Sequence, residues 1–137
     1  MITDRRRLGG DTEAALLAQV GAAARAGVHL IQIRERDLDA AALTRIVARA
    51  VEAVRGTPAR ILVNDRVDVA IAARAHGVHL RGDSMPASCA RTLLPAGSLI
   101  GRSVHTRAEA VEATNADRKS TCLNSSHVSE SRMPSSA

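Results

Sequence analysis

The apolar positions of the chain follow two alternating periods, which predict strands and helices in turn. Short, mostly apolar runs predict strands at residues 29–34, 60–64, 77–80 and 99–103, and Ile2 and Thr3 predict the end of an earlier strand. Apolar residues three and four positions apart predict helices at 11–26, 38–55, 65–75, 86–94 and 107–116. The pattern therefore predicts five consecutive βα units over residues 1–116.

Strands that alternate with helices run parallel, because each helix returns the chain to the same end of the sheet. A doubly wound sheet and a (β/α) barrel both have this order. In a doubly wound sheet the central strands are covered on both faces, so they consist of continuous apolar residues. Here Gln32, Arg34 and Arg36 instead alternate with Ile31, Ile33 and Glu35. We therefore predict an α/β fold, an incomplete TIM (β/α)8 barrel of about five parallel βα units.

The last 21 residues differ in composition from the rest of the chain. Serine supplies 7 of these 21 residues but 4 of the first 116. The segment lacks apolar periodicity, and its sequence is similar to the translation of a short-read sequencing adapter. We therefore predict a partial barrel at residues 1–116 and a non-native, disordered tail at residues 117–137.

Composition and charge argue against several classes of function. The chain has no Phe, Tyr or Trp, so it lacks the aromatic side chains on which single-stranded nucleic acids stack. Its net charge of +5 is spread among acidic residues, which is typical of a solvated surface. No apolar run approaches the roughly 20 residues of a membrane span. We expect a cytoplasmic protein that binds neither nucleic acid nor membranes.

Polar residues follow three predicted strands at their carboxyl ends, where the active sites of barrels lie. Arg34 and Arg36, with Gln32 behind them, can present two guanidinium groups and an amide to one anion. The alternative is an ion-pair cluster at the strand end, formed with the neighbouring carboxylates.

The other candidates at this end also have two interpretations. Asn64 can bind phosphate and Asp65 can bind Mg²⁺, or the two can cap the next helix. Ser103 can bind an anion, or Ser103 or Thr106 can cap the helix that follows. Asp83 can supply a second carboxylate to Mg²⁺, or it can be an exposed turn residue.

Five motifs in chain order resemble the thiamine phosphate synthase family, which includes the thiazole tautomerase (TenI) branch. They are ITDR at 2–5, QIRERDL at 32–38, NDRVDVA at 64–70, GVHL at 77–80 and GRSVH at 101–105. The resemblance implies a Mg²⁺-dependent reaction that joins a pyrimidinylmethyl diphosphate to a thiazole phosphate and releases pyrophosphate. It further implies Asp65 as a Mg²⁺ ligand and the following residues as contacts of the diphosphate substrate: Gln32, Arg34, Arg36, Asn64 and Ser103.

Two departures from the family pattern leave the branch open. Arg36 stands where synthases usually have Lys. Ser84 stands where they have a metal-binding Asp, so that Asp83, one position earlier, is the candidate second Mg²⁺ ligand. The tautomerase branch needs no Mg²⁺ and shifts a proton on a thiazole carboxylate phosphate. We expect a synthase-like transferase, with a tautomerase or a non-catalytic anion-binding fragment as alternatives.

The chain has 137 residues, whereas a complete barrel of eight strands has at least about 200. We therefore expect the parent protein to be the enzyme and this chain alone to be an inactive fragment. Its small-molecule partners are expected to be phosphorylated. Its open strand edges are expected to favour association between copies.

Overall fold

The computed structural model describes residues 1–9 and 12–116, which form one parallel sheet with flanking helices. The strands are β1 (Leu30–Ile33), β2 (Arg60–Asn64), β3 (Gly77–Leu80) and β4 (Leu99–Arg102), paired in chain order. The helices are α1 (Thr12–Arg25), α2 (Ala40–Ala53), α3 (Val67–Ala72), α4 (Ala87–Leu93) and α5 (Arg107–Ala116). The predicted tail at 117–137 lies outside the described residues.

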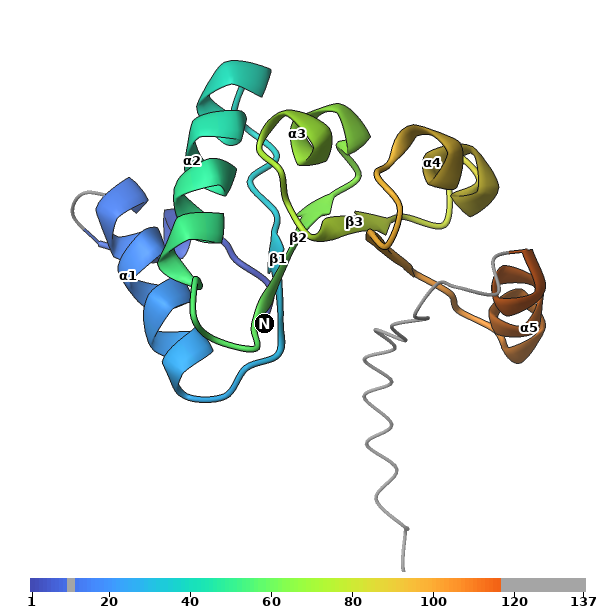
Figure 1. Ribbon diagram of the computed structural model, residues 1–137, viewed down its shortest axis with the longest axis horizontal. Helices are drawn as coiled ribbons and strands as arrows, with labels where there is room; N and C mark the ends of the chain where they lie inside the picture. The colour runs from blue at the N-terminus through green and yellow to red at the C-terminus, as the bar shows by residue number, and fades with distance from the viewer. Residues whose placement is uncertain (10–11, 117–137) are drawn as a thin grey trace, which may run out of the picture.

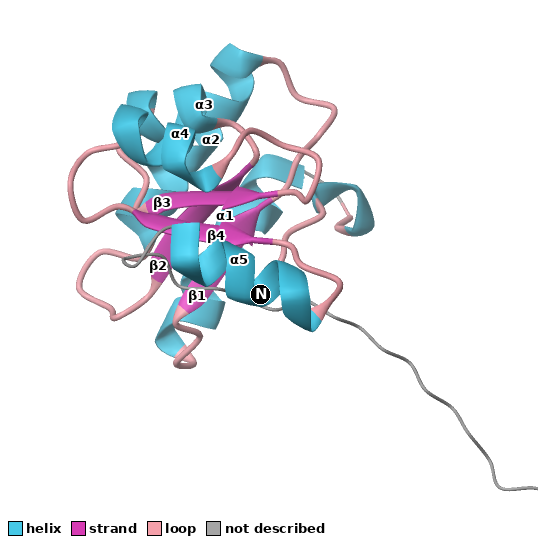
Figure 2. Cartoon of the chain, turned by 90° about the vertical axis from the view of Figure 1, so that its right-hand side faces the viewer, coloured by secondary structure: helices cyan, strands magenta, loops and turns pink. Residues whose placement is uncertain are grey.

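The sequential order of the strands and the placement of the helices distinguish the two architectures. Figure 1 shows α1 to α4 following one another along one side of the curved sheet. In Figure 2, α2, α3 and α4 lie together on one side of the twisted strands. A doubly wound sheet reverses its strand order and carries helices on both faces, whereas a barrel keeps them outside. The α/β fold of the TIM-barrel type is therefore confirmed.

The first predicted strand is reduced to a single bridge. Ile2 forms an isolated parallel bridge with Gln32, whose backbone N–H donates to the carbonyl of Met1 over 2.9 Å. The N–H of Thr3 donates in turn to the carbonyl of Gln32 over 3.0 Å. The chain then turns away into the 3₁₀ helix Arg5–Arg7, so the sheet has four strands where five were expected.

The register of the strands places one apolar row against the helices. Ile33, Val63, Val78 and Ile100 lie opposite one another on adjacent strands and are at most 1% exposed. Burying each such side chain contributes roughly 1.5 to 3 kcal/mol. The row shares a hydrophobic core with these helix residues: Val20, Val47, Val69, Ala70 and Ala90.

A second row of residues lies on the other face of the sheet, because successive residues of a strand point to opposite faces. This row is more polar than the first. Asn64, His79 and Gly101 lie opposite one another on β2, β3 and β4. Gly77 belongs to the adjacent row, between Leu62 and Leu99. This face thus carries polar side chains and glycines beside the two leucines.

Helix α2 shows how local sequence positions these layers. Asp39, and not Asp37, caps it, because the Asp39 carboxylate accepts the N–H of Ala42 over 2.7 Å. Its buried face then packs on the sheet, and Gly56, with a φ of 79°, allows the turn into β2. Within the described residues, no helix has the length and apolar character needed to cross a membrane.

Gly77→Ala is expected to destabilise the fold. An added Cβ would lie 1.9 Å from the backbone carbonyl oxygen of Leu99, so two paired strands would have to separate. We expect the free energy of unfolding, measured with urea, to fall by about 1 to 3 kcal/mol or more. In the control Gly82→Ala, the nearest atom is 3.6 Å from the new Cβ, and we expect a change within about 0.5 kcal/mol. Equal stability of the two variants would contradict this account of the register.

Candidate functional site

Two cavities lie at the carboxyl ends of the strands, and both are lined by Arg36 and Arg81. The larger has a volume of about 680 Å³ and includes Ser103 after β4. The smaller has a volume of about 250 Å³ and includes Asn64 and Asp65 at the end of β2. The candidate residues from three strands therefore meet at one end of the sheet.

Gln32 and Asn64 connect the first two strands at this end. Nε2 of Gln32 donates to Oδ1 of Asn64 over 2.7 Å, and the Gln32 side chain is largely buried. This bond uses the acceptor of the Asn64 side chain and orients it, and the Asn64 amide nitrogen is the group that can donate to a ligand.

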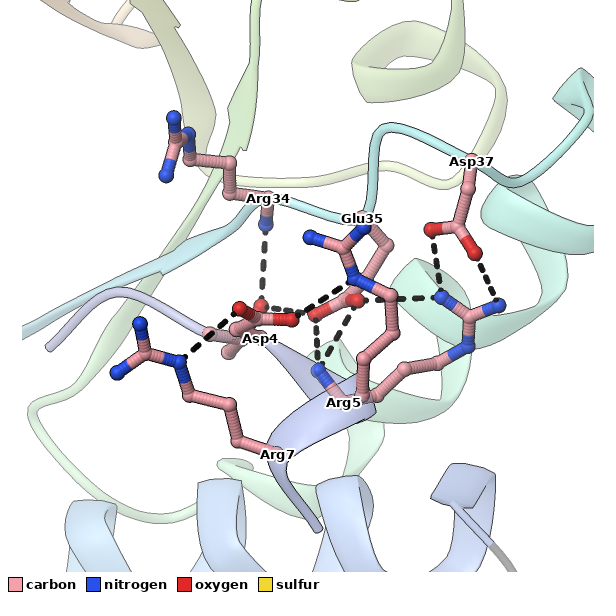
Figure 3. A network of polar contacts seen from close by, with 8 residues as sticks. Asp4, Arg5, Arg7, Arg34, Glu35 and Asp37 are labelled. Atoms are coloured by element: carbon pink, nitrogen blue, oxygen red, sulfur yellow. Dashed lines mark hydrogen bonds and ion pairs between the residues drawn. The ribbon is translucent and has the colours of Figure 1, made fainter.

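The guanidinium groups of Arg34 and Arg36 form no hydrogen bond or ion pair with the residues that the structure describes. The neighbouring carboxylates of Glu35 and Asp37 are bound by Arg5 instead. Figure 3 shows the Arg34 side chain directed away from this network. The ion-pair cluster considered as an alternative does form, but around Arg5. Arg36 lines both cavities, whereas Arg34 lines neither.

Glu35 is the buried centre of that network (Figure 3). Its carboxylate accepts the hydroxyl of Thr3 over 2.7 Å and the backbone N–H of Arg5 over 3.1 Å. Oγ1 of Thr3 accepts the N–H of Arg34 over 3.0 Å. The Arg5 guanidinium binds both oxygens of Asp37, at 2.7 and 2.8 Å, and lowers the pKa of that carboxyl to about 2. A buried charge is stable only with such partners, so the network fixes the segment after β1.

Asp65 has a left-handed backbone conformation, with a φ of 64°. Its N–H donates to the carbonyl of His79 over 2.9 Å. Helix α3 begins only at Val67, and its N-terminus has no side-chain cap. The predicted helix start at 65 is therefore wrong, and neither Asn64 nor Asp65 caps the helix. Positive φ is uncommon at non-glycine residues, and the residues that adopt it are found disproportionately at functional sites.

The two carboxylates predicted to bind Mg²⁺ each have another partner. Oδ1 of Asp65 accepts the hydroxyl of Ser84. Nε of Arg81 donates to Oδ1 of Asp83 over 2.9 Å, and Nη2 of Arg81 binds the other Asp83 oxygen. This ion pair lowers the pKa of Asp83. Among residues 1–9 and 12–116, no three His, Cys, Asp or Glu residues gather as they would around a metal ion.

Ser103 is paired with His79, a partner that the sequence did not reveal. Nε2 of His79 lies 3.0 Å from Oγ of Ser103, and the imidazole is 4% exposed. Nδ1 has no hydrogen-bond partner in the part of the chain that the structure describes, so a proton there would be an unsatisfied buried donor. A neutral ring that donates from Nε2 avoids this and leaves the Ser103 hydroxyl hydrogen for a ligand. The imidazole needs Gly101, because a Cβ there would lie 2.6 Å from Nδ1.

Ser103 does not cap α5. Oγ1 of Thr106 accepts the N–H of Glu109 over 3.2 Å, and the Glu109 carboxylate accepts the N–H of His105 over 2.6 Å. With the N–H of Thr106, which also donates to the Glu109 carboxylate over 3.3 Å, these bonds form a capping box. The N–H groups of His105 and Thr106 lower the pKa of Glu109. Because Thr106 provides the cap, the helix makes no use of the Ser103 hydroxyl, and Ser103 lines the larger cavity.

Comparison with known proteins gives one consistent family. A family model described as thiamine monophosphate synthase matches residues 1–135. A relative in Geobacter sulfurreducens is 48% identical over 114 residues, which are 82% of this chain and 52% of the relative. The protein named thiamine-phosphate synthase in Roseiflexus sp. (strain RS-1) is 39% identical over 116 residues, which are 85% of this chain and 48% of the relative.

A solved structure supports the same grouping. The thiamine phosphate pyrophosphorylase from Pyrococcus furiosus superposes with a TM-score of 0.72 at 34% sequence identity. The superposition covers 84% of this chain and 54% of that protein. The chain thus spans about half the length of the relatives that it matches.

Glu35→Gln is expected to loosen the segment after β1. The new amide nitrogen would face the N–H groups of Arg5, donor against donor, so we expect the free energy of unfolding to fall by about 1 to 3 kcal/mol. Asp37→Asn is the control, because its half-exposed carboxylate binds the same arginine. Urea unfolding of both variants measures the difference, and we expect the smaller loss for Asp37→Asn.

The stability of the chain is expected to fall on mild acidification. Burial lowers the pKa of His79 below the ordinary value of 6.5, so the unfolded chain binds this proton at higher pH than the folded chain does. The contribution of His79 to the free energy of unfolding is therefore fully present above about pH 6.5. It declines as the pH falls toward the lowered pKa of the folded chain. Thermal unfolding between pH 5 and 8 measures the decline, and His79→Gln is expected to reduce it. An unchanged decline in that variant would assign it to other groups.

Proposed function

Because the chain belongs to the thiamine monophosphate synthase family, we propose that it carries the diphosphate-binding part of a synthase-type site. The whole-protein reaction in this proposal joins a pyrimidinylmethyl diphosphate to a thiazole phosphate. The bond between the methylene carbon and the diphosphate breaks, the thiazole becomes attached to that carbon, and pyrophosphate leaves. The protein is then a transferase whose partners are phosphorylated small molecules.

The observation that carries the proposal is the guanidinium of Arg36, which lines both cavities and has no hydrogen bond or ion pair among residues 1–9 and 12–116. Its exposed cationic group can bind phosphate oxygens through two N–H donors at once. The larger cavity, at about 680 Å³, has the volume typical of small-molecule sites. Ser103 on one side and Asn64 on the other add neutral donors around the same place.

These groups suit a reaction in which the leaving group takes up negative charge. Fixed donors directed at the developing charge stabilise it without having to reorganise during the reaction. In the proposed roles, Arg34 and Arg36 attract the diphosphate, and Ser103 and Asn64 orient it. Gln32 holds the Asn64 side chain through the 2.7 Å bond, so it acts as a positioning residue.

The residues fit poorly to the magnesium ion that the resemblance implies. Mg²⁺ prefers an octahedral set of oxygens that are free to bind it. One oxygen of Asp65 is bound by Ser84, and both oxygens of Asp83 are bound by Arg81. We therefore derive no step through a metal ion.

The hydrogen bond between Ser84 and Asp65 favours a second candidate, the thiazole tautomerase reaction. A proton shift on a thiazole carboxylate phosphate requires no divalent cation, and the same anion site can hold its phosphate group. Binding of the pyrimidine diphosphate, and not of the thiazole carboxylate phosphate, would separate the transferase from this candidate. The cytoplasmic location and the association through strand edges stay predictions.

The chain is expected to bind the pyrimidinylmethyl diphosphate through its arginines. Arg36→Ala and Arg34→Ala each remove one cationic partner of the anion, so we expect affinity to fall about tenfold or more. Isothermal titration calorimetry with the diphosphate substrate measures this loss, and urea unfolding checks that stability is unchanged.

Arg55→Ala is the matched control, because Arg55 follows α2 at the opposite end of the sheet. It removes the same charge and is expected to leave the affinity within about twofold. Equal losses in all three variants would mean that the anion responds only to net charge.

A further inference from the structure

We propose that this site neutralises its anion with arginine side chains and does not take up a divalent cation, because Ser84 and Arg81 occupy the carboxylates that such a cation would need. The inference rests on the anion site proposed above. Its metal-binding part concerns residues 65 and 81–84 alone and is tested separately from anion binding.

The first carboxylate, Asp65, is held by a hydroxyl. Ser84 donates to Oδ1 of Asp65, and the same Ser84 oxygen accepts the N–H of Arg81 over 3.1 Å. The N–H of Arg81 also approaches Oδ1 of Asp65, at 3.4 Å. The loop therefore supplies a hydroxyl and a backbone N–H to Asp65.

The second carboxylate, Asp83, is held by a guanidinium. Arg81 places Nε on one Asp83 oxygen and Nη2 on the other, which is the planar two-point geometry that suits a carboxylate. A divalent cation bound at Asp83 would have to displace this guanidinium or stand beside it as a like charge. Each carboxylate thus already has a partner that a cation would have to displace or share.

Positive charge is already present where a cation would act. Arg36 and Arg81 line both cavities, so an anion in either one meets at least these two side chains. Arg102 holds the loop in place, since its guanidinium donates to the carbonyls of Gly82 at 3.0 Å and Met85 at 3.4 Å. Arg36 and Arg81 thus supply positive charge to the cavities, and the loop held by Arg102 positions Arg81.

The metal-binding part predicts a gain of binding in a single substitution. Ser84→Asp places a second carboxylate against Asp65, and we expect affinity for Mn²⁺, used as a probe for Mg²⁺, to rise at least about tenfold over the unmodified chain. Ser88→Asp is the control, because it adds the same charge at an exposed residue of α4 that lines the larger cavity. Titration of tag-free chain, followed by the electron paramagnetic resonance of free Mn²⁺, measures both variants.

Two results would overturn the inference. One is an unmodified chain that binds Mn²⁺ as tightly as Ser84→Asp does, and the other is a folded Ser84→Asp variant that gains no more than Ser88→Asp. If Ser84→Asp does not fold, Arg81→Gln replaces it, because this variant frees both oxygens of Asp83. Mn²⁺ affinity is expected to rise in Arg81→Gln, and no rise would overturn the inference.

The anion part is tested with inorganic diphosphate in calorimetry. We expect affinity in EDTA to be at least as high as in excess Mg²⁺, and a requirement for Mg²⁺ would overturn the inference. If diphosphate binds under neither condition, the proposed function fails, and the Mn²⁺ comparison still decides whether the carboxylates are closed to a cation.

Discussion

The parallel register of the four strands is the constraint on which the core and the site both depend. Ile33, Val63, Val78 and Ile100 form one row across the sheet, and their burial requires that this face meet the helices. Side chains alternate between the two faces, so the row that contains Asn64 must face the other way. A slip of one residue on a strand would turn its apolar side chains away from the helices and place its polar side chains against them. The hydrophobic core therefore determines the face on which the polar candidates collect.

The contacts of the neighbouring carboxylates explain why the two arginines after β1 remain available. The buried Glu35 side chain lies on the same side of the sheet as Ile33, toward the helices. There its carboxylate accepts hydrogen bonds from Thr3 and Arg5. Figure 3 shows the Arg34 side chain directed away from this network, and Arg36 lies in the turn after β1 and lines both cavities. The carboxylate that lies between the two arginines in sequence is thus already bound by Thr3 and Arg5. A pairing of Arg34 or Arg36 with Glu35 would have left the cavities without their unpaired cation.

Periodicity and strand ends were enough to predict the architecture and the end of the sheet at which the candidates lie. β2 and β3 have the predicted bounds, and Asn64 and Ser103 lie at the carboxyl ends as expected. The pairs that decide the chemistry were not predictable in this way. Ser84 meets Asp65 across 19 positions, and Thr3 meets Glu35 across 32, through loops whose conformations follow no periodic pattern. The left-handed backbone of Asp65 also lacks a local signal, since it follows from how β2 leaves the sheet beside β3.

The short loop after β3 contains the residues that distinguish an arginine-dependent anion site from a metal-dependent one. A carboxylate can hold either a divalent cation or a guanidinium, and Asp83 already holds Arg81. The guanidinium is covalently part of the chain, so its charge is present before the anion arrives, whereas a cation must bind or arrive with it. Arg81 is therefore shared between Asp83 and any anion in the cavities, and anion binding must weaken the ion pair or use the N–H groups that Asp83 leaves free. Because Asp83 binds only Nε and Nη2, the Nη1 group of Arg81 can face an anion while the loop stays intact.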